Sequence, residues 1–205
     1  VRQALSMSLD RDLLAEIIAR PGSSLRDVTP AYTIAPPYAY NGKPPEGLWD
    51  PDLKGRGALR AALTLLREAG VPQSPPLTLR LCVRPMSTVF RDAVTLARDW
   101  WERIGLDVSL NEVNGALYQG ARRDFDYDLT FITQCGTFSA PEHFVVNPLT
   151  SKITLDNHWQ ILGFADEGTP EGPARKQAEL RKAEVYYDQT GYLIPLVHMI
   201  YTPRS

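Results

Sequence analysis

The stretch from residue 77 to residue 113 constrains the fold most, because two strand-like patterns flank one helix-like pattern. Apolar and polar residues alternate in LTLRLCV at 77–83 and again at 106–113, which indicates strands with one buried face. Between them, residues 88–104 carry apolar side chains at helical spacing, and Gly105 follows, as is typical of a helix end. A unit of this kind favours two parallel strands joined by a right-handed crossover.

The remaining chain extends the same α/β pattern. Apolar periodicity predicts further helices at 1–19, 56–69, 115–123 and 173–189, and further strands at 127–133 and 193–201. Asp10 would cap the second half of the first helix, and Pro195 inside the last strand favours an edge or end position. Ser139 and Glu142 around Pro141 indicate another helix start. We therefore predict an α/β fold with a small mixed sheet flanked by helices.

Residues 21–53 break this pattern with seven prolines. Helix and central strand are both disfavoured there. The segment also holds large apolar groups that a solvated linker does not need, namely Tyr32, Tyr38, Tyr40 and Trp49. We therefore expect an ordered loop packed on the surface.

Composition excludes several classes of protein. The 205 residues carry a formal net charge of −2, so no broad electrostatic attraction to nucleic acid or anionic membrane is expected. No apolar run approaches the roughly 18 residues of a membrane span. The chain begins at Val1 without a signal peptide, and we expect that an upstream part is missing.

Catalytic and metal-binding motifs are not found in the sequence. There is no G-x-S-x-G elbow, and the three histidines are scattered. Cys82 and Cys135 form no C-x-x-C pair; they form at most one bridge or remain buried thiols. Glu142 and His143 lie near Cys135 in sequence, but their spacing does not support a metal site. We predict a binding protein, not an enzyme, with no metal and no cofactor.

Several segments together resemble one family, the peptide-binding extracytoplasmic solute-binding proteins that deliver ligands to ABC importers. VRQALSMSLDRDLL is similar to the start of the family's second lobe, and ALRAALTLLREAG with LTLRLCV to its helix, turn and strand. RIGLDVSL, FDYDLTFITQCG and GYLIPLVHMIYTP resemble the elements that follow. The resemblance covers nearly the whole chain in the family's order.

The resemblance implies that residues 1–205 are one periplasmic-binding-protein-like lobe, the second of two, with the N-terminal lobe absent. An extended peptide or small solute would lie between the lobes and add main-chain hydrogen bonds to a strand edge. The residues implied to contact it are Arg122, Phe131, Thr133, Gln134, Cys135, Gly136, Thr137 and Phe138. Its implied partners are that first lobe and an ABC permease in the membrane, with no nucleic acid.

The chain departs from the family's pattern at one position. Peptide binders of this type carry an acidic residue in a "C-A-D-Y"-like run, which pairs with the ligand's amino group, whereas this sequence has Thr137 there. A neutral threonine cannot form that charge-assisted bond. Arg122 matches a basic position that in some members holds the ligand's carboxylate end. Because Arg123 shares the same short helix, we expect only one of the two to face the ligand; a solvated pair is the alternative.

The sequence leaves two cellular locations open, each with its own type of protein. The resemblance implies a periplasmic or cell-surface protein, in which Cys135 would lie at the cleft rim and could pair with an upstream cysteine, as in some relatives. The alternative is the ligand-sensing domain of a bacterial transcription regulator built on the same module, which would be cytoplasmic.

Overall fold

A computed structural model describes residues 1–20, 25–33, 53–124, 126–133, 170–191 and 193–201. The chain groups into two compact units. The first comprises Val1–Pro30, Pro51–Ile132 and Leu196–Ser205, and the second comprises Ala31–Asp50 and Thr133–Pro195. The expectation that residues 1–205 form one lobe stays a prediction.

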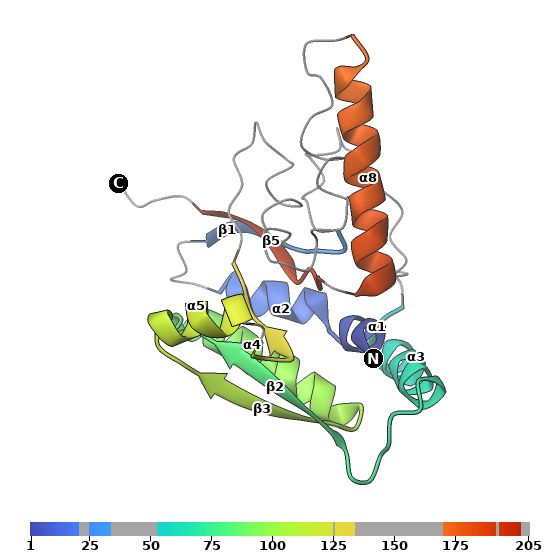
Figure 1. Cartoon of the computed structure of the whole chain (residues 1–205), viewed down its shortest axis with the longest axis vertical. Coiled ribbons are helices and arrows are strands. Elements are labelled where there is room, and N and C mark those ends of the chain that lie inside the picture. The colour runs from blue at the N-terminus through green and yellow to red at the C-terminus, as the bar shows by residue number, and fades with distance from the viewer. Residues whose placement is uncertain (21–24, 34–52, 125, 134–169, 192, 202–205) are drawn as a thin grey trace. The chain divides into compact units, whose positions relative to one another are not determined.

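A three-stranded parallel sheet organises the first unit (Figure 1). Its strand order is β3 (Leu106–Glu112), β2 (Leu77–Val83) and β4 (Leu129–Thr130). Helix α4 (Thr88–Arg103) connects β2 to β3 and packs on β3. Residues pair from Leu77 with Leu106 to Val83 with Glu112, so the strand–helix–strand unit and its parallel pairing are confirmed.

Strand β4 is shorter than the predicted strand at 127–133. The backbone N–H of Asp128 donates to the Arg80 carbonyl at 3.1 Å, but its carboxylate oxygen Oδ2 accepts the Arg80 N–H at 2.7 Å. A side chain thus takes the place that a strand carbonyl would hold. At the other end, the Phe131 carbonyl accepts a tyrosine hydroxyl. The regular ladder therefore spans only Leu129 and Thr130.

The predicted helix at 1–19 consists of two helices, α1 (Arg2–Met7) and α2 (Arg11–Ile18). Asp10 between them is extended, and its Oδ1 accepts the Leu13 N–H at 3.0 Å, which confirms the predicted cap. Buried Arg11 donates to the carbonyl and hydroxyl oxygens of Ser6 at 2.9 and 2.7 Å. These side-chain bonds compete with a continuous helix, which explains the break.

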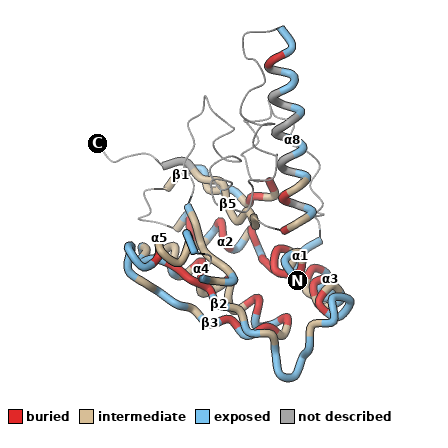
Figure 2. Tube along the Cα trace, viewed as in Figure 1, coloured by how far each residue is buried: buried red, intermediate tan, exposed pale blue. Residues whose placement is uncertain are grey.

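Helix packing forms the core of this unit. Helix α3 (Gly55–Glu68) packs on α1, and α2 packs on α4. Figure 2 shows the buried positions gathered along α1, α2 and α4. The buried apolar side chains shared by these helices and the sheet include Leu5, Leu14, Ile18, Leu66, Val83, Ile104 and Val108. Gly70 and Gly105 follow α3 and α4 with φ of 70° and 85°, a left-handed conformation that glycine adopts without strain.

A second sheet contains a strand that the sequence analysis placed in a loop. β1 (Leu25–Pro30) pairs antiparallel with β5 (Val197–Tyr201). The ladder is irregular between Arg26 and Thr29, where Asp27 has φ of 48°. Pro30 is tolerated because it ends a strand. The prediction of a loop throughout 21–53 is thus wrong for this segment, while residues 34–52 lie outside the described residues.

The α/β fold class is confirmed, and both parallel and antiparallel strand pairs are present. The described strands form one parallel and one antiparallel sheet. Strand β5 begins only at Val197, so the strand predicted at 193–201 is shorter and Pro195 lies before it, not inside it. Helix α5 (Gly115–Asp124) also forms as predicted.

The second unit is described mainly by helix α8 (Gly172–Thr190). It begins with a proline in its first turn and ends at Gly191, with φ of 57°, which confirms the predicted helix at 173–189. Tyr187 is fully buried and meets Tyr186 edge-on. Among the described helices of the whole chain, none is long and apolar enough to cross a membrane. The helix start predicted at Ser139 lies outside the described residues.

Candidate functional site

The carboxyl ends of β2, β3 and β4 meet at one edge of the parallel sheet. The chain leaves this edge through residues 84–87, 113–114 and 131–133. In open parallel sheets, ligands bind outside the carboxyl ends of the strands. This edge is therefore where a binding site is expected in the first unit.

Helix α5 is fixed to this edge by hydrogen bonds from Tyr118. Its ring is buried, and its hydroxyl donates to the Phe131 carbonyl at 2.9 Å and lies 3.1 Å from the Thr130 hydroxyl. Thr130 in turn donates to the Cys82 carbonyl at 2.9 Å. The start of α5 is capped by Asn114, whose Oδ1 accepts the Leu117 N–H at 3.0 Å. The backbone after β4 is therefore held in a defined position relative to α5.

Two neighbouring arginines at the end of α5 have different surroundings. The half-buried Arg122 places its guanidinium carbon 5.8 Å from the centroid of the Tyr118 ring, within the range of a cation–π contact. Arg123 is exposed and binds Asp124 through two hydrogen bonds of 2.9 and 3.0 Å. That bond raises the pKa of Arg123 above its ordinary value. Of these two arginines, only Arg122 is without a carboxylate partner in the described part of the chain.

An aromatic pair lies at the same edge. The rings of Phe131, which follows β4, and Phe90, in the first turns of α4, have centroids 6.0 Å apart and are tilted by 48°. Both side chains are half-buried. Aromatic pairs in this arrangement attract each other beyond their area of burial. This aromatic surface is linked to Arg122 through Tyr118, whose hydroxyl binds the Phe131 carbonyl.

Three carboxylates near the sheet form ion pairs. On the face that carries Thr78 and Arg80, the Arg80 guanidinium binds Asp126 at 2.6 Å and Asp128 at 3.3 Å. These two bonds raise the pKa of Arg80 above its ordinary value. At the end of β3, Glu112 binds Arg91 of α4 at 3.2 Å. Among the described residues, no group of three or more His, Cys, Asp or Glu side chains could hold a metal ion.

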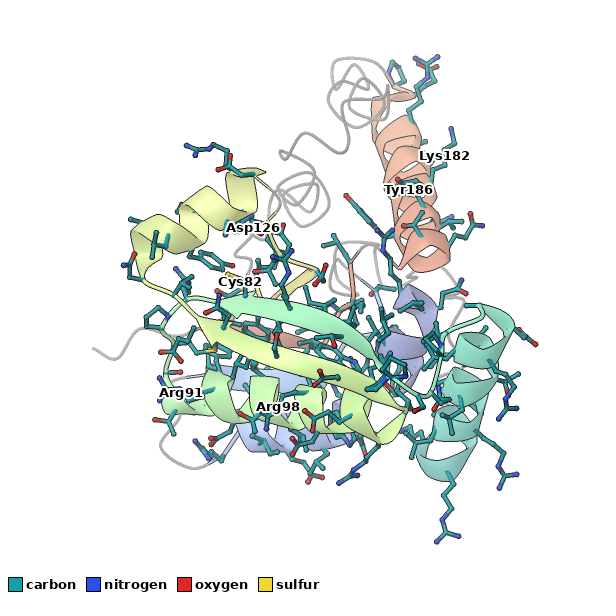
Figure 3. All side chains as sticks on the ribbon, turned by 60° about the horizontal axis from the view of Figure 1, so that its bottom comes forward. Cys82, Arg91, Arg98, Asp126, Lys182 and Tyr186 are labelled. Atoms are coloured by element: carbon teal, nitrogen blue, oxygen red, sulfur yellow. The ribbon has the colours of Figure 1, made fainter. Side chains whose placement is uncertain are left out.

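Cys82 is a buried free thiol on the same face of the sheet as Arg80. Burial, and secondly the charge of Asp126, raise its pKa, while Arg80 opposes them. Figure 3 shows Cys82 and Asp126 on the side of the sheet that carries α5. A raised pKa favours the protonated thiol, which is the less nucleophilic form.

The structure brings together two of the predicted site residues, Arg122 and Phe131, through Tyr118. Thr133 is exposed and begins the second unit. The other five, from Gln134 to Phe138, lie outside the described residues. Sequence reasoning missed Tyr118 and Phe90. The spacing of Tyr118, four residues before Arg122, is the signal that could have identified the first, since these positions are neighbours on a helix.

The described residues have an α/β fold, and the comparison with known proteins identifies the family. Residues 1–155 match the bacterial extracellular solute-binding proteins, family 5 Middle. The chain belongs to this family, which confirms the resemblance seen in the sequence.

Relatives match the chain over almost its whole length. It is 25% identical over 206 residues to the periplasmic oligopeptide-binding protein OppA of Salmonella typhimurium, covering 98% of this chain and 36% of OppA. It is 28% identical over 204 residues to the probable deoxycholate-binding periplasmic protein YgiS of Escherichia coli, covering 97% and 36%. The chain thus spans 36% of the length of each of these relatives.

Solved structures agree on the fold. Haemophilus influenzae OppA in complex with RPPGFSPFR superposes with a TM-score of 0.74 at 19% identity, covering 97% of this chain and 39% of that one. The Escherichia coli murein tripeptide binding protein MppA superposes with a TM-score of 0.72 at 23% identity, covering 96% and 38%. At these identities the likeness establishes the fold alone.

Proposed function

We propose that this chain is the second lobe of a two-lobed extracytoplasmic solute-binding protein, which captures an oligopeptide or a related small solute and delivers it to an ABC permease. One observation carries the proposal: the chain matches relatives named as periplasmic binding proteins over 97–98% of its own length but 36% of theirs. The first lobe of the same protein would supply the opposite wall of the site.

The proposed mechanism is reversible capture by closure of the two lobes, a hinge-type motion. An extended solute would form main-chain hydrogen bonds to the chain that follows β4, from Phe131 to Phe138. The hydrogen bond from Tyr118 to the Phe131 carbonyl supports this assignment, because it fixes the start of that segment. Arg122 would bind a carboxylate of the solute with its planar guanidinium.

No covalent chemistry belongs to this function. The family consists of solute-binding proteins, which supports a binding protein in place of an enzyme, without cofactor or nucleic acid. The names of the relatives also support a periplasmic or cell-surface setting. None of them supports the alternative of a cytoplasmic regulator.

The proposal is tested by comparing two proteins: the full natural chain that carries this sequence, and residues 1–205 alone. Small-solute sites bury most of the ligand surface, so a lobe with one wall should bind weakly. Calorimetry with a peptide library should show clear binding by the full natural chain and no binding tighter than the high micromolar range by residues 1–205. Submicromolar binding by residues 1–205 alone would contradict the two-lobed site.

A further inference from the structure

We propose that the site at the carboxyl edge of the sheet takes an organic anion with an apolar body and no free amino group. This inference rests on the proposed function, because it names the class of solute that the same edge binds. It follows from three properties of the described residues: an unpaired cation, an adjacent aromatic surface, and carboxylates already bound to other arginines.

The cation is Arg122. Its neighbour Arg123 is paired with Asp124 by two hydrogen bonds, and arginines 80 and 91 also bind carboxylates. Arg84, directly after β2, has no ion pair among the described residues either, but its side chain is exposed. Arg122 instead lies half-buried against the Tyr118 ring. A guanidinium held in place by a ring, whose donors make no hydrogen bond to the described residues, can bind a carboxylate in a bidentate manner.

The apolar surface is the Phe90–Phe131 pair. It is connected to Arg122 through Tyr118, which contacts the guanidinium with its ring and the Phe131 carbonyl with its hydroxyl. Because both phenylalanines remain half-exposed, an apolar group bound beside them would bury further aromatic area, which is favourable. One ligand can therefore place a carboxylate on Arg122 and an apolar group on the pair.

A ligand's ammonium group has no carboxylate among these described residues that is not already bound to an arginine. The described carboxylates at the end of β3, at the end of α5 and just before β4 each bind an arginine, namely Glu112, Asp124, Asp126 and Asp128. A desolvated ammonium without a carboxylate is costly, and the charge of Arg122 would repel it. A ligand with an unblocked amine should therefore bind more weakly than the same ligand with the amine blocked.

The experiment uses four versions of one dipeptide with the full natural protein: Leu-Phe, acetyl-Leu-Phe, Leu-Phe-amide and acetyl-Leu-Phe-amide. The dissociation constants separate the contribution of the carboxylate from that of the amine. We expect acetyl-Leu-Phe to bind tightest, by about tenfold or more over both Leu-Phe and the acetylated amide, since each comparison changes one charge-assisted interaction.

Two pairs of variants assign the effect to residues. Arg122→Gln should remove the preference for acetyl-Leu-Phe over its amide, whereas Arg123→Gln should leave it unchanged. Phe90→Ala should weaken the binding of all four probes to a similar extent, while Leu117→Ala, at a side chain that is 62% exposed on α5, should not. Circular dichroism of each variant verifies folding; the four-probe comparison with the unchanged protein stands even if a variant fails to fold.

Two results would overturn the inference, and a third would overturn the proposed function as well. If Leu-Phe binds as tightly as acetyl-Leu-Phe, or tighter, the inference is overturned while solute capture itself stands. Equal losses in Arg122→Gln and Arg123→Gln would also overturn it. If neither the four probes nor the peptide library bind the full natural protein, the proposed function fails together with the inference.

Discussion

The indole Nε1 of Trp101 donates a hydrogen bond to the carbonyl oxygen of Leu5 across 3.0 Å, joining residues that are 96 positions apart in the chain. Trp101 lies near the end of α4 and is 7% exposed, while Leu5 lies in α1. The Leu5 carbonyl also accepts the Ser8 hydroxyl at 3.0 Å. One buried carbonyl thus connects the break after α1 to the helix that covers the parallel sheet.

Replacing Trp101 with Phe should destabilise the first unit by about 0.5–1.5 kcal/mol, because the buried Leu5 carbonyl loses one donor and keeps the Ser8 hydroxyl. The control is Trp100→Phe, which removes similar ring area from the next residue, also buried, without breaking any hydrogen bond that the structure describes for it. Urea unfolding of both variants provides the measurement. Equal losses would show that ring packing, not the hydrogen bond, stabilises the contact.

The contact between Trp101 and Leu5 could not be predicted from the sequence. Trp101 lies off the apolar stripe of α4, so the periodicity of this helix by itself indicates only Trp100 as a core residue. Both are buried, because α1 approaches α4 from a side that a single helix's pattern cannot specify. The two strands and the helix at 77–113 were predictable because their apolar spacing is regular. The strand at Leu25–Pro30 was not, because it depends on pairing with β5, far away in the chain.

The free energy of unfolding should decrease at high pH because of the Cys82 thiol. Burial raises the pKa of its thiol, so the folded state holds the proton to a higher pH than the unfolded chain does. The contribution of this group is fully present below the unfolded pKa of about 8.5 and is lost as pH rises through the folded value. The free energy of unfolding should therefore decrease more steeply above about pH 8.5 than in Cys82→Ala.

Thiol labelling gives an independent measurement on the same residue. At about pH 8, a buried protonated thiol should react far more slowly than a free cysteine, and denaturation should restore the ordinary rate. Rapid labelling of native Cys82 would contradict its burial. Cys135 lies outside the described residues, and its faster labelling at a cleft rim stays a prediction from the sequence.

Gly105 and Gly70 form a matched pair for backbone strain. Both have positive φ after a helix, so alanine should cost about 1–2 kcal/mol at either position. At Gly105 a methyl group would also meet the Gln73 side chain, whereas at Gly70 it would meet nothing within 4 Å. Gly105→Ala should thus be the more destabilising variant in thermal unfolding. Equal effects would mean that Gln73 moves aside without cost.

The candidate site was only partly predictable. Family resemblance predicted contacts from Arg122 and the chain after β4, but it could not show that Arg122 and Arg123 have different surroundings. The two arginines differ because Asp124 pairs with Arg123, whereas Tyr118 contacts Arg122. Both are neighbours of the arginines on α5, but which of them meets which arginine depends on side-chain conformation, which spacing does not determine.

Thr137 provides the final prediction, on a residue that only the family resemblance places in the site. If it occupies the position where peptide binders carry an acid, Thr137→Asp in the full natural protein should strengthen the binding of ligands with a free amino group. A charge-assisted bond would contribute roughly 1.5–3 kcal/mol, less the cost of desolvating the new carboxylate. Acidic ligands should bind more weakly, and salt should reduce the effect only modestly, because a closed site is poorly screened. The measurement is a titration of both proteins with one peptide and its acetylated form. Equal changes for the two forms would place Thr137 away from the ligand's amino group.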